Sequence, residues 1–265
     1  MVRTLIQLLL FILLIVLSSF QTEEITIPPI TKTPAFINGE ELKYTLHYGF
    51  ITAGEALITL KAETFQEKEV FHATAEAQTT GVVNKVFKVV DIYESFFDPG
   101  TNLPIKSIRN IREGNYKKYT EVIFNHRNKT VTSSLTGEHK VPVNILDMVA
   151  ALFYIRRIDF SNFKENDIVK VDTYFDDDLF PFYIVFKGRE TVKTELGKFN
   201  CLKFVPVVEP GRIFKKKDDM TFWLSDDENK IPICIKFDIL VGSFKCDIVS
   251  FKNNKYPMSS KLPTK

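Results

Sequence analysis

Apolar and polar residues alternate along most of the chain, in short runs that are separated by turn-forming residues. In the run from Leu42 to Tyr48 every second residue is Leu or Tyr, and the run from Ile231 to Ile239 repeats the alternation. Strict alternation is typical of a β-strand with one buried face. Roughly a dozen such strands with hairpin-length turns predict a mainly β fold, which would be a curled antiparallel sheet or half-open barrel.

One segment, Asn144 to Arg157, follows a helical pattern instead. Asn144 is the expected N-cap, Asp147 follows three residues later, and Arg156 and Arg157 fall in the last turn, where the helix dipole favours cations. The apolar residues recur at spacings of three and four, which places them on one helix face: Ile145, Met148, Val149, Leu152 and Ile155. One central amphipathic helix among strands predicts a cover over the open side of the curled sheet.

The two ends of the chain differ in composition from its centre. Residues 1–19 combine Arg3 with an apolar run from Leu5 to Leu17 and two serines, which is the layout of a secretory signal peptide. The run is short for a membrane span, which needs about 20 residues, so cleavage is favoured over an N-terminal anchor. We expect a Pro-rich extended leader at 20–35, a single β-rich domain at 36–252 and a disordered polar tail at 253–265.

The N-terminal pattern predicts an exported protein. After signal cleavage no stable transmembrane span is expected, and no cysteine follows the apolar run, which disfavours a lipid anchor. The expected location is therefore the periplasm or the cell envelope.

A row of alanines indicates where a ligand could be held. Ala73, Ala75 and Ala77 lie on one face of a predicted strand, and such small side chains leave volume that something else has to fill. Either the helix fills it, or a ligand cavity lies between the sheet and the helix. Further candidates for the lining of that cavity are Tyr44, Tyr48, Asp147, Tyr154 and Arg156. For the last three residues the alternative is a role as cap, surface residue or dipole partner.

Composition and motifs argue against several classes of function. Lys+Arg 35 are balanced by Asp+Glu 33, so the charge gives no argument for a nucleic-acid partner. The 4 His lack the spacing of a zinc site, and the sequence contains no glycine-rich phosphate loop and no nucleophile elbow. We therefore predict no catalytic, cofactor or metal residues. The 3 Cys form no full disulfide framework, and Cys234 and Cys246 are expected to remain free thiols.

Two charged groups are assigned to the surface. Arg109 is expected to point outward from a hairpin, and Asp176 to Asp178 are expected to form a solvated turn. The acidic run lacks the spaced oxygen ligands of a calcium loop, so it is not interpreted as a metal site.

Several short motifs also occur in a particular order. They are Phe36-x-x-Gly39-Glu40-x-Leu42-x-Tyr44, the corner bracketed by Gly49 and Gly54, Asp91-x-Tyr93-x-Ser95, Asp147 and Arg156 in the helix, Gly188-x-Glu190, Gly197-x-Phe199-x-Cys201, and Trp223-Leu-Ser-Asp226 before Ile231-Pro232. In this order the chain resembles the exported bacterial proteins grouped as domain-of-unknown-function family 3108. The resemblance implies an envelope protein with a β-rich fold. It implies no reaction and provides no functional residues to transfer.

The leading functional hypothesis is a non-enzymatic envelope protein that binds an apolar or amphipathic ligand such as a lipid. One alternative is an interaction scaffold that joins an envelope protein partner through strand edges or the leader. The other is a hydrolase of envelope polymers that uses a pair of carboxylates, with Glu40, Glu55 and Asp91 as candidates.

Overall fold

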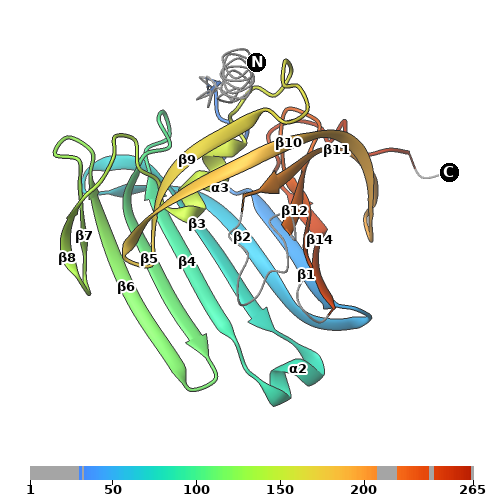
Figure 1. Ribbon diagram of the computed structural model, residues 1–265, viewed down its shortest axis with the longest axis horizontal. Helices are drawn as coiled ribbons and strands as arrows, with labels where there is room; N and C mark the ends of the chain where they lie inside the picture. Colours follow the sequence, from blue (N-terminus) through green and yellow to red (C-terminus); the bar gives the residue numbers. More distant parts are fainter. Residues whose placement is uncertain (1–29, 32, 208–219, 239–241, 264–265) are drawn as a thin grey trace, which may run out of the picture.

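The computed structural model describes residues 30–31, 33–207, 220–238 and 242–263. Its strands form one antiparallel sheet with the order β8-β7-β6-β5-β4-β3-β2-β1-β14-β13-β12-β11-β10-β9 (Figure 1). Two meanders are thus joined by the pairing of the first strand with the last. The edge strands β8 and β9 are not neighbours in the sheet, so the curled sheet stays half open and the predicted fold class is confirmed.

The strand bounds agree with hairpin connections along most of the chain. They are β1 (Glu41–Tyr48), β2 (Ile51–Phe65), β3 (Lys68–Thr79), β4 (Val90–Phe97), β5 (Pro104–Glu113), β6 (Tyr116–Asn125), β7 (Thr130–Ser133), β8 (Gly137–Lys140), β9 (Ile168–Phe175), β10 (Asp178–Thr194), β11 (Gly197–Pro206), β12 (Met220–Ser225), β13 (Pro232–Asp238) and β14 (Ser243–Lys252). Two helices occur among the described residues, α2 (Gly81–Val86) and α3 (Met148–Ile155). Neither of these two is long and apolar enough to cross a bilayer.

The central helix α3 begins later than the sequence pattern predicts. Asp147, and not Asn144, is its N-cap, and the Asp147 carboxylate accepts hydrogen bonds from the backbone N–H groups of Val149 and Ala150. Asn144 has a left-handed backbone, with φ of 58°. Leu146 instead pairs with the free edge of β9, because its N–H donates to Asp172 O and its carbonyl accepts from Tyr174 N. The residues predicted to form the first turn of the helix are therefore not helical, because Leu146 forms its backbone hydrogen bonds with the edge of β9 instead.

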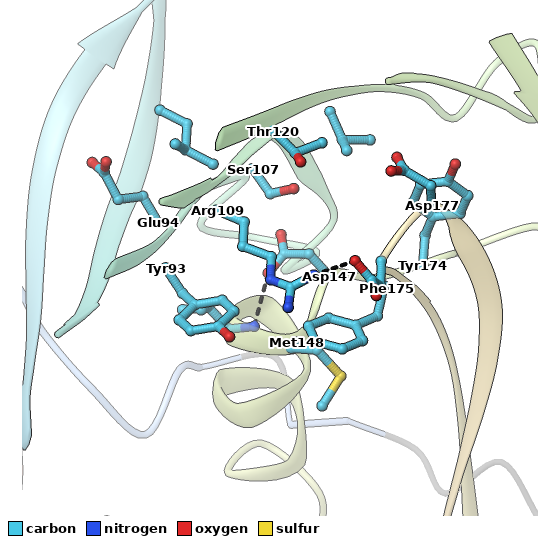
Figure 2. A pocket seen from close by; sticks show the side chains of 14 residues that line it. Tyr93, Glu94, Ser107, Arg109, Thr120, Asp147, Met148, Tyr174, Phe175 and Asp177 are labelled. Carbon is cyan, nitrogen blue, oxygen red and sulfur yellow. Dashed lines mark hydrogen bonds and ion pairs between the residues drawn. The ribbon is translucent and has the colours of Figure 1, made fainter. Parts of the chain in front are cut away.

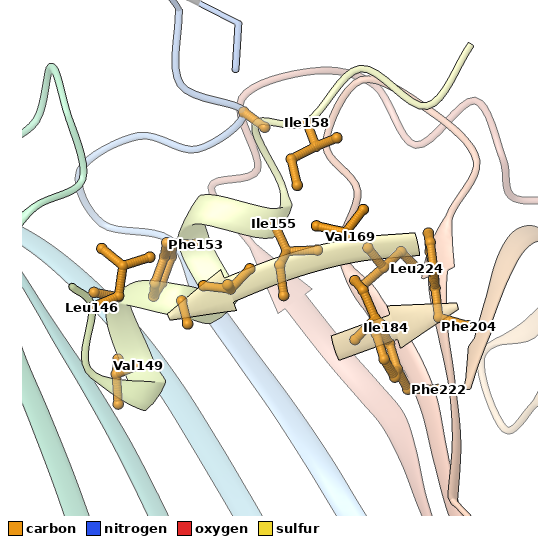
Figure 3. Packing of buried hydrophobic residues seen from close by; sticks show 14 of the residues in the cluster. Leu146, Val149, Phe153, Ile155, Ile158, Val169, Ile184, Phe204, Phe222 and Leu224 are labelled. Atoms are coloured by element: carbon orange, nitrogen blue, oxygen red, sulfur yellow. The ribbon is translucent and has the colours of Figure 1, made fainter. Parts of the chain in front are cut away.

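The helix lies on the inner face of the curled sheet, where it contacts β3 and β4 of the first meander and β9 of the second. Its buried face packs into a cluster that we call the helix core, part of which is seen in Figure 3. Ala73 on β3 is fully buried beneath the helix, whereas Phe204 and Phe222 bring the second meander into the same cluster. Burial of such side chains contributes roughly 1.5–3 kcal/mol each, so this cluster is the main source of stability for the fold.

Two arginines anchor the end of α3 inside the protein. Arg156 is fully buried and forms a forked ion pair with Glu40, with N–O distances of 2.6 and 2.7 Å. Arg157 is also buried, and it donates to Asn102 Oδ1 at 2.7 Å and to the carbonyl of Thr31 at 2.9 Å. The sequence indicated a dipole role for these two cations but not the buried partners that each of them has.

The terminal segments are more ordered than the sequence indicates. Near the N-terminus, Thr31 N–H donates to Arg157 O, and Ala35 is buried in the helix core, so this part of the leader is packed. Residues 253–263 were expected to be a disordered tail but run beside the sheet, where Ser260 is buried and its hydroxyl donates to Asp227 Oδ2 at 2.7 Å. The predicted signal peptide at 1–19 lies outside the described residues.

Candidate functional site

A polar seam forms where the tip of the β9–β10 hairpin meets β5 and β6. The hairpin crosses over the mouth of the curled sheet, and its tip lies beside the inner face of the first meander (Figures 1 and 2). Asp176 and Asp177 form the two-residue turn, and both have a left-handed backbone, as the tight turns of β-hairpins require. The turn is where the sequence predicts it, but its acids are not simply solvated.

Two cations of the first meander hold this turn. Arg109 on β5 forms an ion pair with Asp176, and Lys118 Nζ on β6 lies 2.6 Å from the same Asp176 carboxylate. Ser133 Oγ donates to Asp177 at 2.5 Å. The hydrogen bond from Lys118, together with Arg109, lowers the pKa of Asp176 below its usual value. The seam therefore joins the β9–β10 hairpin to the first meander through side chains, although the backbones of β8 and β9 do not pair.

Aromatic rings frame the cation in the seam. The Arg109 guanidinium lies 4.8 Å from the centre of the Phe175 ring and 5.9 Å from that of Tyr93. Figure 2 shows Arg109 between these two rings, which come from β9 and β4. A guanidinium at such distances is attracted by the ring faces in addition to its ion pair. Arg109 thus points inward, and the expectation that it points outward is wrong.

Asp147 lies at the helix end of the same seam. Its carboxylate accepts the two backbone N–H groups at the start of α3, and Ser95 Oγ donates to it at 2.6 Å. Burial raises the pKa of Asp147 to about 6, although the hydrogen bonds oppose the rise. Ser95 is itself fully buried, so its hydroxyl positions the carboxylate and is not open to a substrate.

The cavity inside the seam is small. Its volume is about 40 Å³, close to the room that one or two water molecules occupy. Three buried polar atoms around it have no protein partner within the described part of the chain, namely Arg109 Nε, Thr120 Oγ1 and Tyr174 OH. Buried polar groups of this kind are ordinarily satisfied by ordered water. The seam is therefore suited to closing the fold and not to holding an organic ligand.

A larger cleft lies on the other side of α3, and we call it the apolar cleft. Its volume is about 450 Å³, within the range typical of small-molecule sites. The lining is mostly apolar and comes from Ile30, Leu103, Pro142, Val143, Leu146, Tyr154 and Val171. Thr101, Lys170 and Asp172 provide polar groups, and Lys170 Nζ lies 2.8 Å from Asp172.

A family model for proteins of unknown function, DUF3108, matches residues 43–249. The match covers most of the chain and nearly the whole sheet. This chain belongs to the DUF3108 family. No curated protein matches it.

Three solved structures resemble this DUF3108 protein in fold to different degrees. A β-barrel-like protein of domain of unknown function DUF1849 from Brucella abortus aligns with a TM-score of 0.57 at 10% identity, and covers 85% of this chain and 99% of its own. A Bacteroides fragilis protein provisionally described as exported, with a YmcC-like fold, has a TM-score of 0.39 at 10% identity and covers 84% of this chain and 100% of its own. A Parabacteroides distasonis protein provisionally described as a lipoprotein has a TM-score of 0.33 at 12% identity, covering 84% and 99%. Only the first alignment is close enough to support the fold.

The predicted cavity residues of this DUF3108 chain do not converge on one site. Ala73 lies beneath α3, Ala75 packs against the edge of the helix core, and Ala77 is exposed, so the helix fills the space only over the first of them. Tyr44 is buried in a separate cluster, where its hydroxyl donates to Pro232 O at 3.0 Å. Tyr48 lies against Phe244, with 4.9 Å between ring centroids.

The three helical candidates have different roles. Asp147 lines the seam and Tyr154 lines the apolar cleft, whereas the guanidinium of Arg156 is buried in its ion pair with Glu40. Helical spacing alone could not separate them, because it does not show which element covers each side of the helix.

The carboxylates proposed for a hydrolase lie apart as well. Glu40 is buried against Arg156, whereas Glu55 accepts from Gln78 at 2.7 Å and pairs with Lys43. Asp91 accepts the backbone N–H of Arg112 at 3.1 Å. Asp91 is in the row that runs through Ala77 and Ala56, and Glu55 is the next residue on β2, so these two side chains point to opposite faces of the sheet.

The sequence reasoning missed the cation pair of the seam. Arg109 stands opposite Thr120 on β6 and opposite Tyr93 on β4. The side chains of these three residues therefore lie on the same face of the sheet, which is the inner one. Tyr93 and Arg109 at matched strand positions were the available signal, but using it required the register of two hairpins.

The prediction that Cys234 and Cys246 are free thiols is confirmed. Cys201, Cys234 and Cys246 are free thiols. Cys246 stands opposite Ile235, and Cys234 stands opposite Asp247, so the two cysteines on β13 and β14 are offset by one residue.

Proposed function

We propose that this DUF3108 protein is an exported cell-envelope protein that binds an apolar or amphipathic ligand, such as a lipid, without catalysing a reaction. The observation that carries this proposal is the apolar cleft beside α3. Its volume of about 450 Å³ and its aliphatic lining suit an acyl chain or a similar hydrocarbon group. The proposed cavity is thus moved from the alanine row to the opposite side of the helix.

The polar groups of the cleft favour an amphipathic ligand over a purely apolar one. Leu146 and Val171 form buried walls, whereas Thr101 and Val143 are exposed. Lys170 is half-buried and its ammonium group is shared with Asp172. The anionic headgroup of a ligand would replace Asp172 as the partner of the Lys170 ammonium group. The hydrocarbon chain of the ligand would displace water from the aliphatic walls.

Filling the cleft tests the proposal. Val143→Trp and Thr101→Trp enlarge exposed lining residues, so the added rings enter the cleft without disturbing buried packing. We expect either variant to weaken binding of a fluorescent fatty acid, measured by titration, by about tenfold or more, since a tenfold change needs only about 1.4 kcal/mol. Leu135→Trp is the matched control, because Leu135 is 54% exposed, close to the 58% of Val143, but lies outside the cleft. Equal binding by all three variants and the wild type would contradict the proposed site.

The alanine row provides a competing location that can be tested separately. Ala75 packs beside Tyr93 at the edge of the helix core. If ligand occupied that side of the sheet, Ala75→Phe would reduce uptake in the same titration. We expect a folded Ala75→Phe variant to take up as much ligand as the wild type. A loss of binding as large as that of Val143→Trp would instead place the ligand at the alanine row.

The scaffold alternative receives less support from the sheet edges. β8 has only four residues, Gly137–Lys140, and most of their side chains are polar or charged, which is unfavourable for the addition of another strand. The edge of β9 is already used by Leu146. A partner that docks through the leader remains an alternative, and recovery of one protein from envelope extracts by the wild type but not by a chain lacking residues 21–35 would favour it.

Export itself is part of the proposal. We infer cleavage after the predicted signal peptide at 1–19, release into the periplasm or envelope space, and no lipid anchor. The mass of the mature protein tests the cleavage and the lack of a lipid anchor, because an uncleaved chain or an acylated N-terminus would each be heavier than the processed chain.

A further inference from the structure

The far end of the first meander exposes its apolar side chains to an unusual degree. Among the described large hydrophobic residues, the three most exposed are Phe50 at 107%, Val86 at 83% and Val82 at 72%. Phe50 lies in the β1–β2 turn, and both valines belong to α2, which follows β3. These turns lie at the same end of the sheet, away from the hairpin that crosses its mouth (Figure 1).

The short helix α2 is built as a projection and not as a core element. None of its residues is buried, although three of the six are valines. It is fixed at its start, where Thr80 N–H donates to Ala53 O on β2. Immediately after the helix, the exposed Phe87 leans over the β5–β6 turn, so close that a Cβ on Gly114 would lie 2.9 Å from the ring. The backbone of this end is thus anchored while its apolar side chains face solvent.

Cations surround the exposed apolar residues. Lys85 and Lys88 lie in and just after α2, and Arg112 and Lys117 flank the neighbouring β5–β6 turn; all four are exposed. None of the four forms an ion pair within the part of the chain that the structure describes, and Glu113 is the acid between them. Tyr116, which is 54% exposed, adds an aromatic ring with a polar tip. We call these exposed residues together the basic apolar rim, which consists of Phe50, Val82, Lys85, Val86, Phe87, Lys88, Arg112, Tyr116 and Lys117.

We propose that the basic apolar rim docks the protein on the surface of a bilayer that contains anionic phospholipid. Exposed valine and phenylalanine side chains enter the boundary between headgroups and acyl chains, and the lysines meet the phosphate groups. Charge selects this occupant, because a second copy of the chain would bring the same unpaired cations face to face. The proposal stands on the rim alone and does not depend on ligand binding in the apolar cleft.

Sedimentation with vesicles tests the proposal. Wild-type protein, exported and processed, is expected to sediment with vesicles of phosphatidylethanolamine and phosphatidylglycerol, and to bind phosphatidylcholine vesicles at least tenfold more weakly. The double variant Val82→Asp/Val86→Asp removes the apolar contact, and Lys85→Glu/Lys88→Glu reverses two charges. Each is expected to lower the partition coefficient on anionic vesicles by tenfold or more, because all four side chains are exposed and their replacement leaves the packing intact.

Matched controls separate the rim from other routes to the membrane. Leu135→Asp places one such charge on an exposed apolar residue of the β7–β8 turn and is expected to sediment as the wild type does. All variants keep the same N-terminus, so a binding that survives both rim variants would overturn the proposal. The rim variants are also expected to retain fatty-acid binding in the cleft. Wild-type protein that binds the fatty acid but not anionic vesicles would contradict the rim proposal alone, and wild-type protein that binds these vesicles but not the fatty acid would contradict the cleft proposal alone.

Discussion

At the scale of single residues, Asp147 has the most unusual chemistry in the described part of the fold. Its carboxylate is needed as the cap of α3, but the cap is buried in the seam, so the charge is removed from water. Burial raises the pKa from 3.8 to about 6. For an acid with a raised pKa the folded state binds the proton more tightly, so its contribution to stability is present below pH 4 and is lost as the pH rises towards 6.

Asp147→Asn is expected to remove this pH dependence. The amide still provides a cap oxygen but cannot ionise. Each pKa unit corresponds to about 1.4 kcal/mol, so the difference between wild type and variant should change by up to about 3 kcal/mol between pH 4 and pH 7. Urea unfolding at several pH values measures it. Asp159→Asn is the control, because Asp159 is exposed and its backbone bond to Ser161 lowers its pKa. A wild-type slope in Asp147→Asn would contradict the assignment.

The Arg156–Glu40 pair is a second prediction at this scale. Both side chains are at most 1% exposed, and the arginine also lies 5.3 Å from the centres of the Phe36 and Phe153 rings. Arg156→Met alone leaves the Glu40 carboxylate buried without its partner and should cost about 3–5 kcal/mol of unfolding free energy. The double variant Glu40→Leu/Arg156→Met should recover most of this loss, because well-packed apolar replacements of a buried pair are often neutral. A double variant no more stable than the single would contradict this account.

At the scale of elements, the tip of the β9–β10 hairpin is held on the first meander by a few polar contacts. Asp176 is half exposed, so its ion pairs with Arg109 and Lys118 contribute little to global stability. They do, however, decide whether the hairpin tip rests on the first meander. We therefore expect the tip to open locally at a lower free energy than the domain as a whole unfolds.

Asp176→Asn is expected to loosen the tip without unfolding the domain. Global stability should fall by no more than about 1 kcal/mol, whereas amide hydrogen exchange across the hairpin turn should become several-fold faster. Asp178→Asn is the control directly after the turn, at the start of β10, since the Asp178 side chain is exposed and accepts the N–H of its neighbour Leu179. Equal exchange in the two variants would show that Asp176 does not hold the hairpin.

The elements also show where sequence reasoning stops. Alternation located the strands well, because one face of each is buried and the period of two is strict. The helix α3 was found, but its first turn was lost to the edge of β9, which no local pattern reveals. The tail at 253–263 is polar and looked disordered, yet Asn229 Nδ2 donates to Tyr256 O at 2.9 Å and holds it. A hydrogen bond between residues so far apart in sequence cannot be predicted from amino-acid composition.

At the scale of the whole molecule, the fold class and family followed from the order of strands and motifs, but the site did not. A row such as Ala73, Ala75 and Ala77 can lie under a helix at one end and in solvent at the other, as it does here. The apolar cleft is assembled from the leader, the β4–β5 turn, the segment before α3 and β9. Segments so distant in sequence meet only because the sheet curls, so no window of sequence contains the site.

The central claim is that the folded domain holds an amphipathic ligand in the apolar cleft. Native mass spectrometry of the exported protein, purified without detergent from its own type of host, tests it most directly. The account predicts a species heavier than the processed chain, whose extra mass disappears after organic extraction and is reduced in Val143→Trp but not in Leu135→Trp. A wild-type protein that carries no extra mass, even after incubation with vesicles of phosphatidylethanolamine and phosphatidylglycerol, would contradict it.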